Sequence, residues 1–144
     1  MKSIQELQDE IVQDFSILEG DHEMTLFYVM ELGQKLTPFP VDKKTDDYLV
    51  KGCQSKVWLN AYEEDGKIYF QADSNTAITK GLISLLIRVF NGQSPEDILT
   101  ADLFFVQKIG MERFIGTQRS NGFAAMVKQM KLFALAIKQK LSIG

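Results

Sequence analysis

Two runs of alternating apolar and polar residues flank the dipeptide Asp65-Gly66, and this arrangement constrains the fold more than any other part of the chain. A tight hairpin turn needs positive φ at both central residues, and Asp-Gly supplies it. With this turn, Tyr62 lies opposite Tyr69 and Ala61 opposite Phe70, so each face pairs like with like. The sequence therefore predicts an antiparallel hairpin. Its core-facing residues are expected to be Val57, Leu59 and Phe70.

Helical periodicity before the hairpin predicts two amphipathic helices. Gly20 ends the first, Asp21 caps the second, and Pro38 stops the second. The apolar stripe of the first helix consists of Ile4, Leu7, Ile11, Phe15 and Leu18. The stripe of the second consists of Met24, Tyr28, Leu32 and Leu36. Residues 41–52 then form a polar loop.

Further helices are predicted after the hairpin. Residues 76–90 are apolar nearly all round, which is typical of a buried central helix, and Asp73-Ser74-Asn75 supplies its caps. A short helix begins at Ser94-Pro95, residues 102–118 hold mixed helical pieces, and Asn121 begins the last helix. Its inward residues are expected to be Met126, Met130, Phe133, Ile137 and Leu141, and its outward residues Lys128, Lys131 and Lys138.

This order of elements predicts one α+β domain over residues 1–144, with helices packed on one side of a small antiparallel sheet built around the hairpin. The net charge of −3 argues against a nucleic-acid partner. There is no apolar run of about 18 residues, so we expect no membrane span, and the N-terminus does not look like a secretory signal.

One Cys and one His limit the chemistry further. They exclude an internal disulfide, a structural zinc site and a cluster held by cysteines of a single chain. A lone free thiol is typical of a reducing compartment, so we expect the protein in the cytoplasm. The histidine, His22, lies in the turn before the second helix and is expected to be exposed.

The charge is unevenly distributed along the chain. Residues 1–47 carry 11 acidic and 4 basic side chains, whereas residues 119–144 carry 5 basic side chains and no acidic one. Two solvated helical faces account for this distribution. The alternative is a face that steers a partner of opposite charge, and the sequence alone does not separate the two interpretations.

Cys53 is the residue whose surroundings suggest chemistry. It lies in a polar segment before the first strand, where Gly52 permits unusual backbone angles and close approach by another chain. Lys51 and Lys56 are expected to lower the pKa of the thiol. A thiol in such a polar loop is also expected to be accessible, and the two together would make Cys53 reactive. Two alternatives stay open: a thiol redox protein whose Cys53 reacts with peroxide, and an interaction domain with an inert cysteine.

Residues 50–58, which read VKGCQSKVW, resemble the V-x-G-C-Q-S-x-V-W signature of the SufE family, the sulfur acceptors of cysteine desulfurases. Three further blocks follow in the family's order. Residues 31–36 resemble its E-L-G-x-x-L, residues 72–82 its D-S-x-x-A-x-I-x-K-G-L, and residues 119–122 its S-R-x-x-G. Residues 115–119 depart from the family's L-[ST]-P-S-R and lack its proline.

The resemblance implies a SufE/IscU-like fold and a role for Cys53 as a persulfide carrier. IscU-type cluster scaffolds use three cysteines, so a chain with one can relay sulfur but cannot hold a cluster by itself. The residues that would contact the persulfide or a partner are Gly52, Gln54, Ser55 and Arg119.

The resemblance also implies the partners. Sulfur would come from a SufS-like cysteine desulfurase, which the protein would stimulate, and would pass to a SufBCD-like iron–sulfur scaffold. The pyridoxal phosphate (PLP) would belong to the desulfurase, so this chain needs no cofactor and no metal. It would act as a sulfur-transfer accessory protein, and a homodimer is among the assemblies that the resemblance allows.

Overall fold

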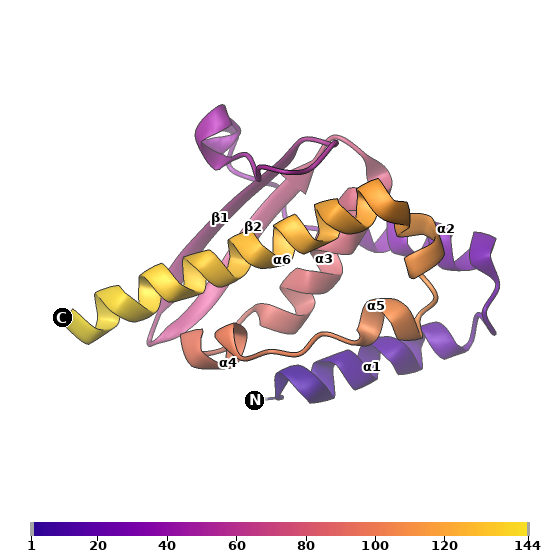
Figure 1. Ribbon diagram of the computed structural model, residues 1–144, viewed down its shortest axis with the longest axis horizontal. Coiled ribbons are helices and arrows are strands. Elements are labelled where there is room, and N and C mark those ends of the chain that lie inside the picture. Colours follow the sequence, from indigo (N-terminus) through magenta and orange to yellow (C-terminus); the bar gives the residue numbers. More distant parts are fainter. Residues whose placement is uncertain (1, 144) are drawn as a thin grey trace.

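The computed structural model describes residues 2–143, with side chains for residues 2–112 and 122–143. Helices pack on one face of a two-stranded antiparallel sheet, which is an α+β architecture (Figure 1). The elements are α1 (Ile4–Ser16), α2 (His22–Gln34), β1 (Val57–Glu64), β2 (Lys67–Ser74), α3 (Ala77–Phe90), α4 (Pro95–Leu99), α5 (Phe105–Lys108) and α6 (Glu112–Ile143). Short 3-10 turns, Val41–Lys43 and Asp46–Tyr48, lie between α2 and β1. None of the described helices combines the length and the apolar character needed to cross a membrane.

The hairpin has the register predicted from the turn. Ala61 pairs with Phe70 and Tyr62 with Tyr69, and the two tyrosine rings stack with centroids 5.6 Å apart. Asp65 and Gly66 both have positive φ, at 53° and 78°. The predicted inner face is buried, and it consists of Val57, Leu59 and Phe70.

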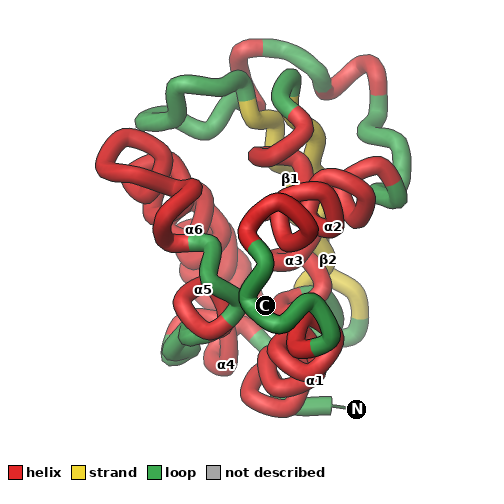
Figure 2. Tube along the Cα trace, turned by 90° about the vertical axis from the view of Figure 1, so that its right-hand side faces the viewer, coloured by secondary structure: helices red, strands yellow, loops and turns green. Residues whose placement is uncertain are grey.

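The core lies around α3, which packs against β2 on one side and α2 on the other. Seen end on, α2 and α3 lie together, with α6 to one side and α1 below them (Figure 2). The long α6 runs beside the hairpin and packs on α4 (Figure 1). Asp21 and Ser94 cap α2 and α4 as expected, because each side chain accepts a backbone N–H of the first turn.

The contact between α2 and α3 differs from the prediction. The buried face of α2 consists of Thr25, Val29 and Gly33, whereas Met24, which was expected to point inward, is 52% exposed. The reason is a backbone-to-backbone approach. A Cβ added at Gly81 would lie 2.2 Å from the carbonyl oxygen of Val29, and one at Gly33 would lie 2.6 Å from the amide nitrogen of Gly81. The smallest residues therefore occupy the interface, and the larger apolar residues flank it.

The start and the inner face of α6 also differ from the prediction. The helix begins at Glu112, shortly after Gly110 with its φ of 78°, and not at Asn121. Polar and glycine residues inside a helix cost only about 1 kcal/mol each, so they do not force a break. The buried inner residues are Met126, Met130 and Ala134, while Leu141 is 43% exposed.

Candidate functional site

Cys53 lies in a short loop, residues 51–56, that leaves the sheet just before β1. The amide of Val50 donates to the carbonyl of Val57 at 2.8 Å, and this hydrogen bond closes the loop at its base. Gly52 has a φ of 92°, in the region that favours glycine, so a side chain there would strain the backbone. The sheet therefore fixes both ends of the loop.

The second half of the loop is tied to the start of α3. The Ser55 hydroxyl accepts a hydrogen bond from Thr76 Oγ1 at 3.2 Å and lies 3.3 Å from Thr79 Oγ1. The backbone amide of Lys56 donates to the side-chain oxygen of Asn75, Oδ1, at 3.0 Å. The backbone amide of Asn75 donates in return to the backbone carbonyl of Lys56 at 3.2 Å. The N-cap residue of α3 is Thr76, and its side chain makes no capping hydrogen bond. The prediction that residues 73–75 cap α3 is wrong.

The first half of the loop is covered by α6. The sulfur of Cys53 lies 3.5 Å from the carbonyl oxygen of Gly122, a distance at which the S–H can donate. A Cβ added at Gly52 would touch the side chain of Ala125 at 3.4 Å. The thiol is half-buried and packs against the hydrophobic core. A helix some 70 residues later in the chain thus covers the cysteine.

This burial raises the pKa of the Cys53 thiol. The sequence predicted the opposite direction, from the charges of Lys51 and Lys56. Both lysines are exposed, so water screens their charge, and desolvation of the half-buried sulfur is what moves the pKa. In the free protein, burial therefore favours the neutral thiol of Cys53 over its thiolate.

An ion cluster beside the loop was missed by the sequence analysis. Asp73 accepts from Lys44 at 2.8 Å and lies 3.3 Å from Lys80. The ammonium of Lys44 also lies over the Trp58 ring, 4.8 Å from its centroid. Partial burial works to raise the pKa of the Asp73 carboxyl, but hydrogen bonds from Lys44, the Ser74 amide and Lys80 together hold it below its usual range. The cluster anchors the segment before the Cys53 loop to the sheet.

The structure brings together part of the predicted site. Gly52 and Cys53 lie under α6, while Ser55 is turned toward α3 and Gln54 is exposed. Arg119 lies within α6, and its side chain is outside the described residues. His22 is exposed at the first residue of α2, as expected. Among the described side chains, no three His, Cys, Asp or Glu residues gather into a group that would hold a metal ion.

The raised pKa gives a first testable prediction. Alkylation of native Cys53 by iodoacetamide should rise with pH along a curve whose midpoint lies above that of an unperturbed thiol, about 8.5. A synthetic peptide of residues 50–56 retains both lysines but lacks α6, so it is the matched control. Its midpoint should be lower than that of the folded chain. A folded-chain midpoint at or below that of the peptide would mean that the lysine charges outweigh burial.

Comparison with known proteins places this geometry in context. A family model described as SufE, Fe-S metabolism associated domain, matches residues 9–134. The cysteine desulfuration protein SufE of Wigglesworthia glossinidia brevipalpis is 34% identical over 134 residues, which cover 90% of this chain and 92% of that protein. A SufE-like protein of Rhizobium etli is 34% identical over 128 residues, 85% of this chain and 86% of the other.

Two further relatives differ in length or in sequence. The chloroplastic/mitochondrial SufE-like protein 1 of Arabidopsis thaliana is 33% identical over 91% of this chain but only 35% of its own length. The solution structure of a hypothetical protein from Thermus thermophilus superimposes with a TM-score of 0.73. It covers 90% of this chain and 94% of that one at 22% identity, so this likeness concerns the fold alone.

Proposed function

The chain belongs to the SufE family, and we propose that it accepts sulfur from a PLP-dependent cysteine desulfurase as a persulfide on Cys53. Family membership supports the broader role, that of a sulfur acceptor in iron–sulfur metabolism. The position of the single cysteine is the observation that supports Cys53 as the residue that holds the persulfide. It lies in a loop held at both ends, under a helix that contacts the sulfur at one point.

The transfer is a thiol–disulfide type of exchange. The Cys53 thiolate attacks the outer sulfur of the donor's cysteine persulfide. A new S–S bond forms to Cys53, the S–S bond of the donor breaks, and the donor cysteine leaves as a thiolate. No oxidant or reductant is consumed, because sulfane sulfur moves between two thiolates. The chain holds no second cysteine, so the persulfide cannot collapse into an internal disulfide.

The half-buried state of Cys53 leads us to propose a change at α6 during the reaction. In the free protein burial favours the neutral thiol over the thiolate, and the sulfur lies 3.5 Å from the Gly122 carbonyl oxygen. We infer that docking of the desulfurase displaces this part of α6 from the loop and thereby frees the sulfur to ionise. The glycine at position 52 leaves room for the partner's backbone to approach. Gln54 would then supply a hydrogen bond to the added sulfur, and Arg119 a charge for a partner carboxylate. Ser55 would do the same only after its hydroxyl leaves Thr76 and Thr79, which hold it toward α3.

Delivery repeats the exchange in the opposite sense. A thiolate of an iron–sulfur scaffold attacks the terminal sulfur, the S–S bond to Cys53 breaks, and Cys53 returns as a thiolate. The protein would thus be a carrier between two partners, with the PLP on the desulfurase. We place this relay in the cytoplasm, because a free thiol persists in a reducing compartment.

The alternative of a peroxide-reactive thiol differs in what it needs besides Cys53. Both reactions use the thiolate of Cys53, which burial disfavours in the free chain. A peroxide-reactive cysteine would also need a reductant to restore it.

Intact mass spectrometry tests the proposal directly. After incubation with a cysteine desulfurase, cysteine and PLP, we expect the chain to gain one sulfur atom, to lose it on reduction, and to gain none as Cys53→Ala. The control is the same incubation without cysteine, which supplies no sulfur. An unmodified wild-type mass beside an active desulfurase would contradict the proposal.

A further inference from the structure

The carboxylate of Asp73 lies where the segments that hold the Cys53 loop meet. Asp73 is near the end of β2 and pairs across the sheet with Trp58. Its oxygen Oδ2 accepts from Lys44 at 2.8 Å, and its oxygen Oδ1 lies 3.3 Å from the ammonium of Lys80. The Asp73 side chain is only 16% exposed. One mostly buried carboxylate thus holds two lysines at once.

The two lysines come from segments on opposite sides of that loop. Lys44 belongs to the segment that leads into the loop, and its ammonium also lies over the Trp58 ring on β1, which follows the loop. Lys80 is the fourth residue of α3 and comes directly after Thr79, whose hydroxyl lies 3.3 Å from that of Ser55 within the loop. The carboxylate therefore ties the entry of the loop to the helix that holds its second half.

The negative charge of Asp73 is what makes the two lysines converge. Two ammonium groups repel each other, and each lysine loses rotamer freedom when it is held in one place. An ionised carboxylate offsets both costs, because its hydrogen bonds to ammonium groups are stronger than those of a neutral amide. Both lysines reach water, and ion pairs of that kind contribute little to global stability. Loss of the charge should therefore loosen the loop rather than unfold the chain.

We propose that Asp73 is a positioning residue for the transfer of sulfur to and from Cys53. It keeps the entry and the exit of the loop at a fixed separation, so the loop is already ordered when the donor persulfide arrives. The exchange requires two sulfur atoms at bonding distance, and a thiol that is held in place beforehand reaches that geometry more often. This inference rests on the proposed function, because the reaction that Asp73 serves is the exchange at Cys53.

A looser loop should have two effects of opposite sign. Small reagents should reach Cys53 more often, because the loop then packs less firmly under α6. Transfer from the desulfurase should be slower, because the loop must first be ordered in the complex before the two sulfur atoms meet. Docking itself should change little, since the residues on the surface of the loop stay the same.

Asp73→Asn tests the proposal, because it removes the charge at nearly constant shape. Alkylation of Cys53 by iodoacetamide should become at least about threefold faster. The plateau of desulfurase stimulation should fall at least about fivefold, while the concentration for half-maximal stimulation changes by less than about twofold. The matched control is Asp14→Asn, which breaks the ion pair of α1 with Arg88 and should leave both readings at the wild-type level. Urea unfolding of both variants measures how much of either change comes from global stability.

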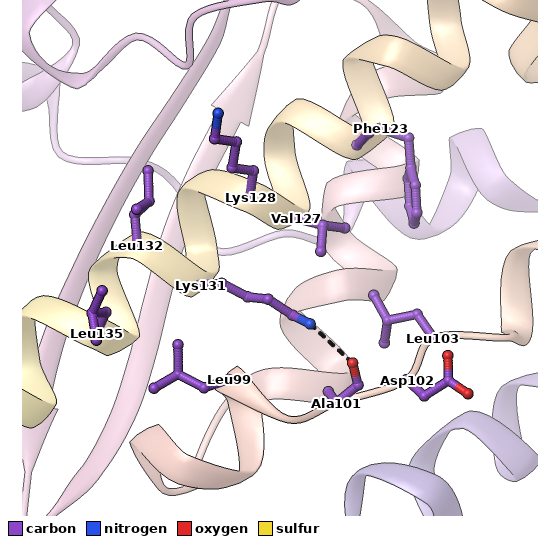
Figure 3. Close-up of a pocket in the computed structure, with 11 residues that line it drawn as sticks. Leu99, Ala101, Asp102, Leu103, Phe123, Val127, Lys128, Lys131, Leu132 and Leu135 are labelled. Carbon is purple, nitrogen blue, oxygen red and sulfur yellow. Dashed lines mark hydrogen bonds between the residues drawn. The ribbon is translucent and has the colours of Figure 1, made fainter.

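Lys44→Gln is the second variant and decides the test if Asp73→Asn fails to fold, because the Lys44 side chain is 42% exposed. It should change both readings in the same directions as Asp73→Asn. The double variant should differ little from Asp73→Asn alone, since the tie is already broken. The control for the lysine is Lys128→Gln, because Lys128 is exposed on α6 and points away from the residues around it (Figure 3).

Equal readings for Asp73→Asn and Asp14→Asn overturn the positioning role of Asp73. Changes no larger than the loss of global stability accounts for overturn it as well. The mass gain of the wild-type chain, measured in parallel, separates this failure from a failure of the proposed function. No gain beside an active desulfurase contradicts the acceptance of sulfur itself, whereas a normal gain with equal readings contradicts only the role of Asp73.

Discussion

Replacing Cys53 with serine should abolish the stimulation of the partner desulfurase and leave binding largely intact. A desulfurase stalls when its own persulfide is not removed, so an acceptor raises turnover by removing it. A serine hydroxyl is nearly isosteric with the thiol, but it is not ionised at neutral pH and does not replace a thiolate in the exchange. The plateau of alanine production against protein concentration should therefore fall to the rate of the desulfurase alone.

Two companion measurements distinguish chemistry from docking. A binding isotherm for Cys53→Ser should nearly coincide with that of the wild type. Arg119→Ala should instead raise the concentration needed for half-maximal stimulation while the plateau is retained, if Arg119 contacts the partner. Should Cys53→Ser stimulate as well as the wild type, the protein would be an allosteric activator rather than a sulfur acceptor.

Gly81→Ala should be among the most destabilising single-atom additions in this chain. The new methyl group would lie 2.2 Å from the Val29 carbonyl oxygen and 2.5 Å from Val29 Cγ1. Because backbone atoms of α2 stand in the way, a rotamer change cannot relieve the clash, and α2 must move off α3. Overpacking of this kind costs about 1–3 kcal/mol or more, which outweighs the roughly 1 kcal/mol that alanine gains over glycine in a helix.

Urea unfolding with a matched glycine measures this effect. We expect Gly81→Ala to lose about 2 kcal/mol of the free energy of unfolding, or roughly 6 °C in Tm. Gly122→Ala is the control, because it also lies inside a helix but a Cβ there meets its nearest neighbour, the Cys53 sulfur, at an ordinary 3.9 Å. That variant should be neutral or slightly more stable. Equal midpoints for both variants would mean that α2 and α3 are farther apart than described.

The parts of the fold that the sequence predicted are those fixed by local chemistry. Asp65-Gly66 specifies a turn, and the turn fixes the register, because a slip by one residue would put Leu59 on the wrong face. The caps Asp21 and Ser94 are equally local. In each case the residues that decide the structure lie within a few positions of one another.

The errors concern contacts between distant segments. The apolar stripe through Met24 is a sound periodic pattern, but Gly33 and Gly81 allow two backbones to touch, and that contact leaves Met24 exposed. The other stripe residues stay half-buried at the edge of the core, and they are Tyr28, Leu32 and Leu36. Both glycines stand in blocks that resemble the family's motifs, although periodicity assigned them no role. Likewise, Ser120-Asn121-Gly122 has the composition of a helix start, yet α6 passes through it from Glu112.

The site shows the same division between local and distant causes. The sequence identified the loop around Cys53 and the importance of Gly52. It assigned the wrong direction to the thiol pKa, because the lysines are neighbours in sequence while the helix that buries the sulfur comes some 70 residues later. The pairing of Lys44 with Asp73 was missed for the same reason.

Because α6 lies over Cys53, the rate at which a reagent modifies this thiol reports on local separation of α6 from the Cys53 loop. At low concentrations of a thiol reagent, modification of Cys53 measures the equilibrium between covered and uncovered states. At saturating concentrations the rate levels off at the opening rate itself, as in hydrogen exchange. Measuring that limiting rate needs no introduced or removed cysteine, because Cys53 is the only cysteine in the chain. If a partner waits for α6 to open spontaneously, sulfur transfer cannot be faster than this opening rate. If the partner displaces α6 itself, transfer can be faster than the opening rate.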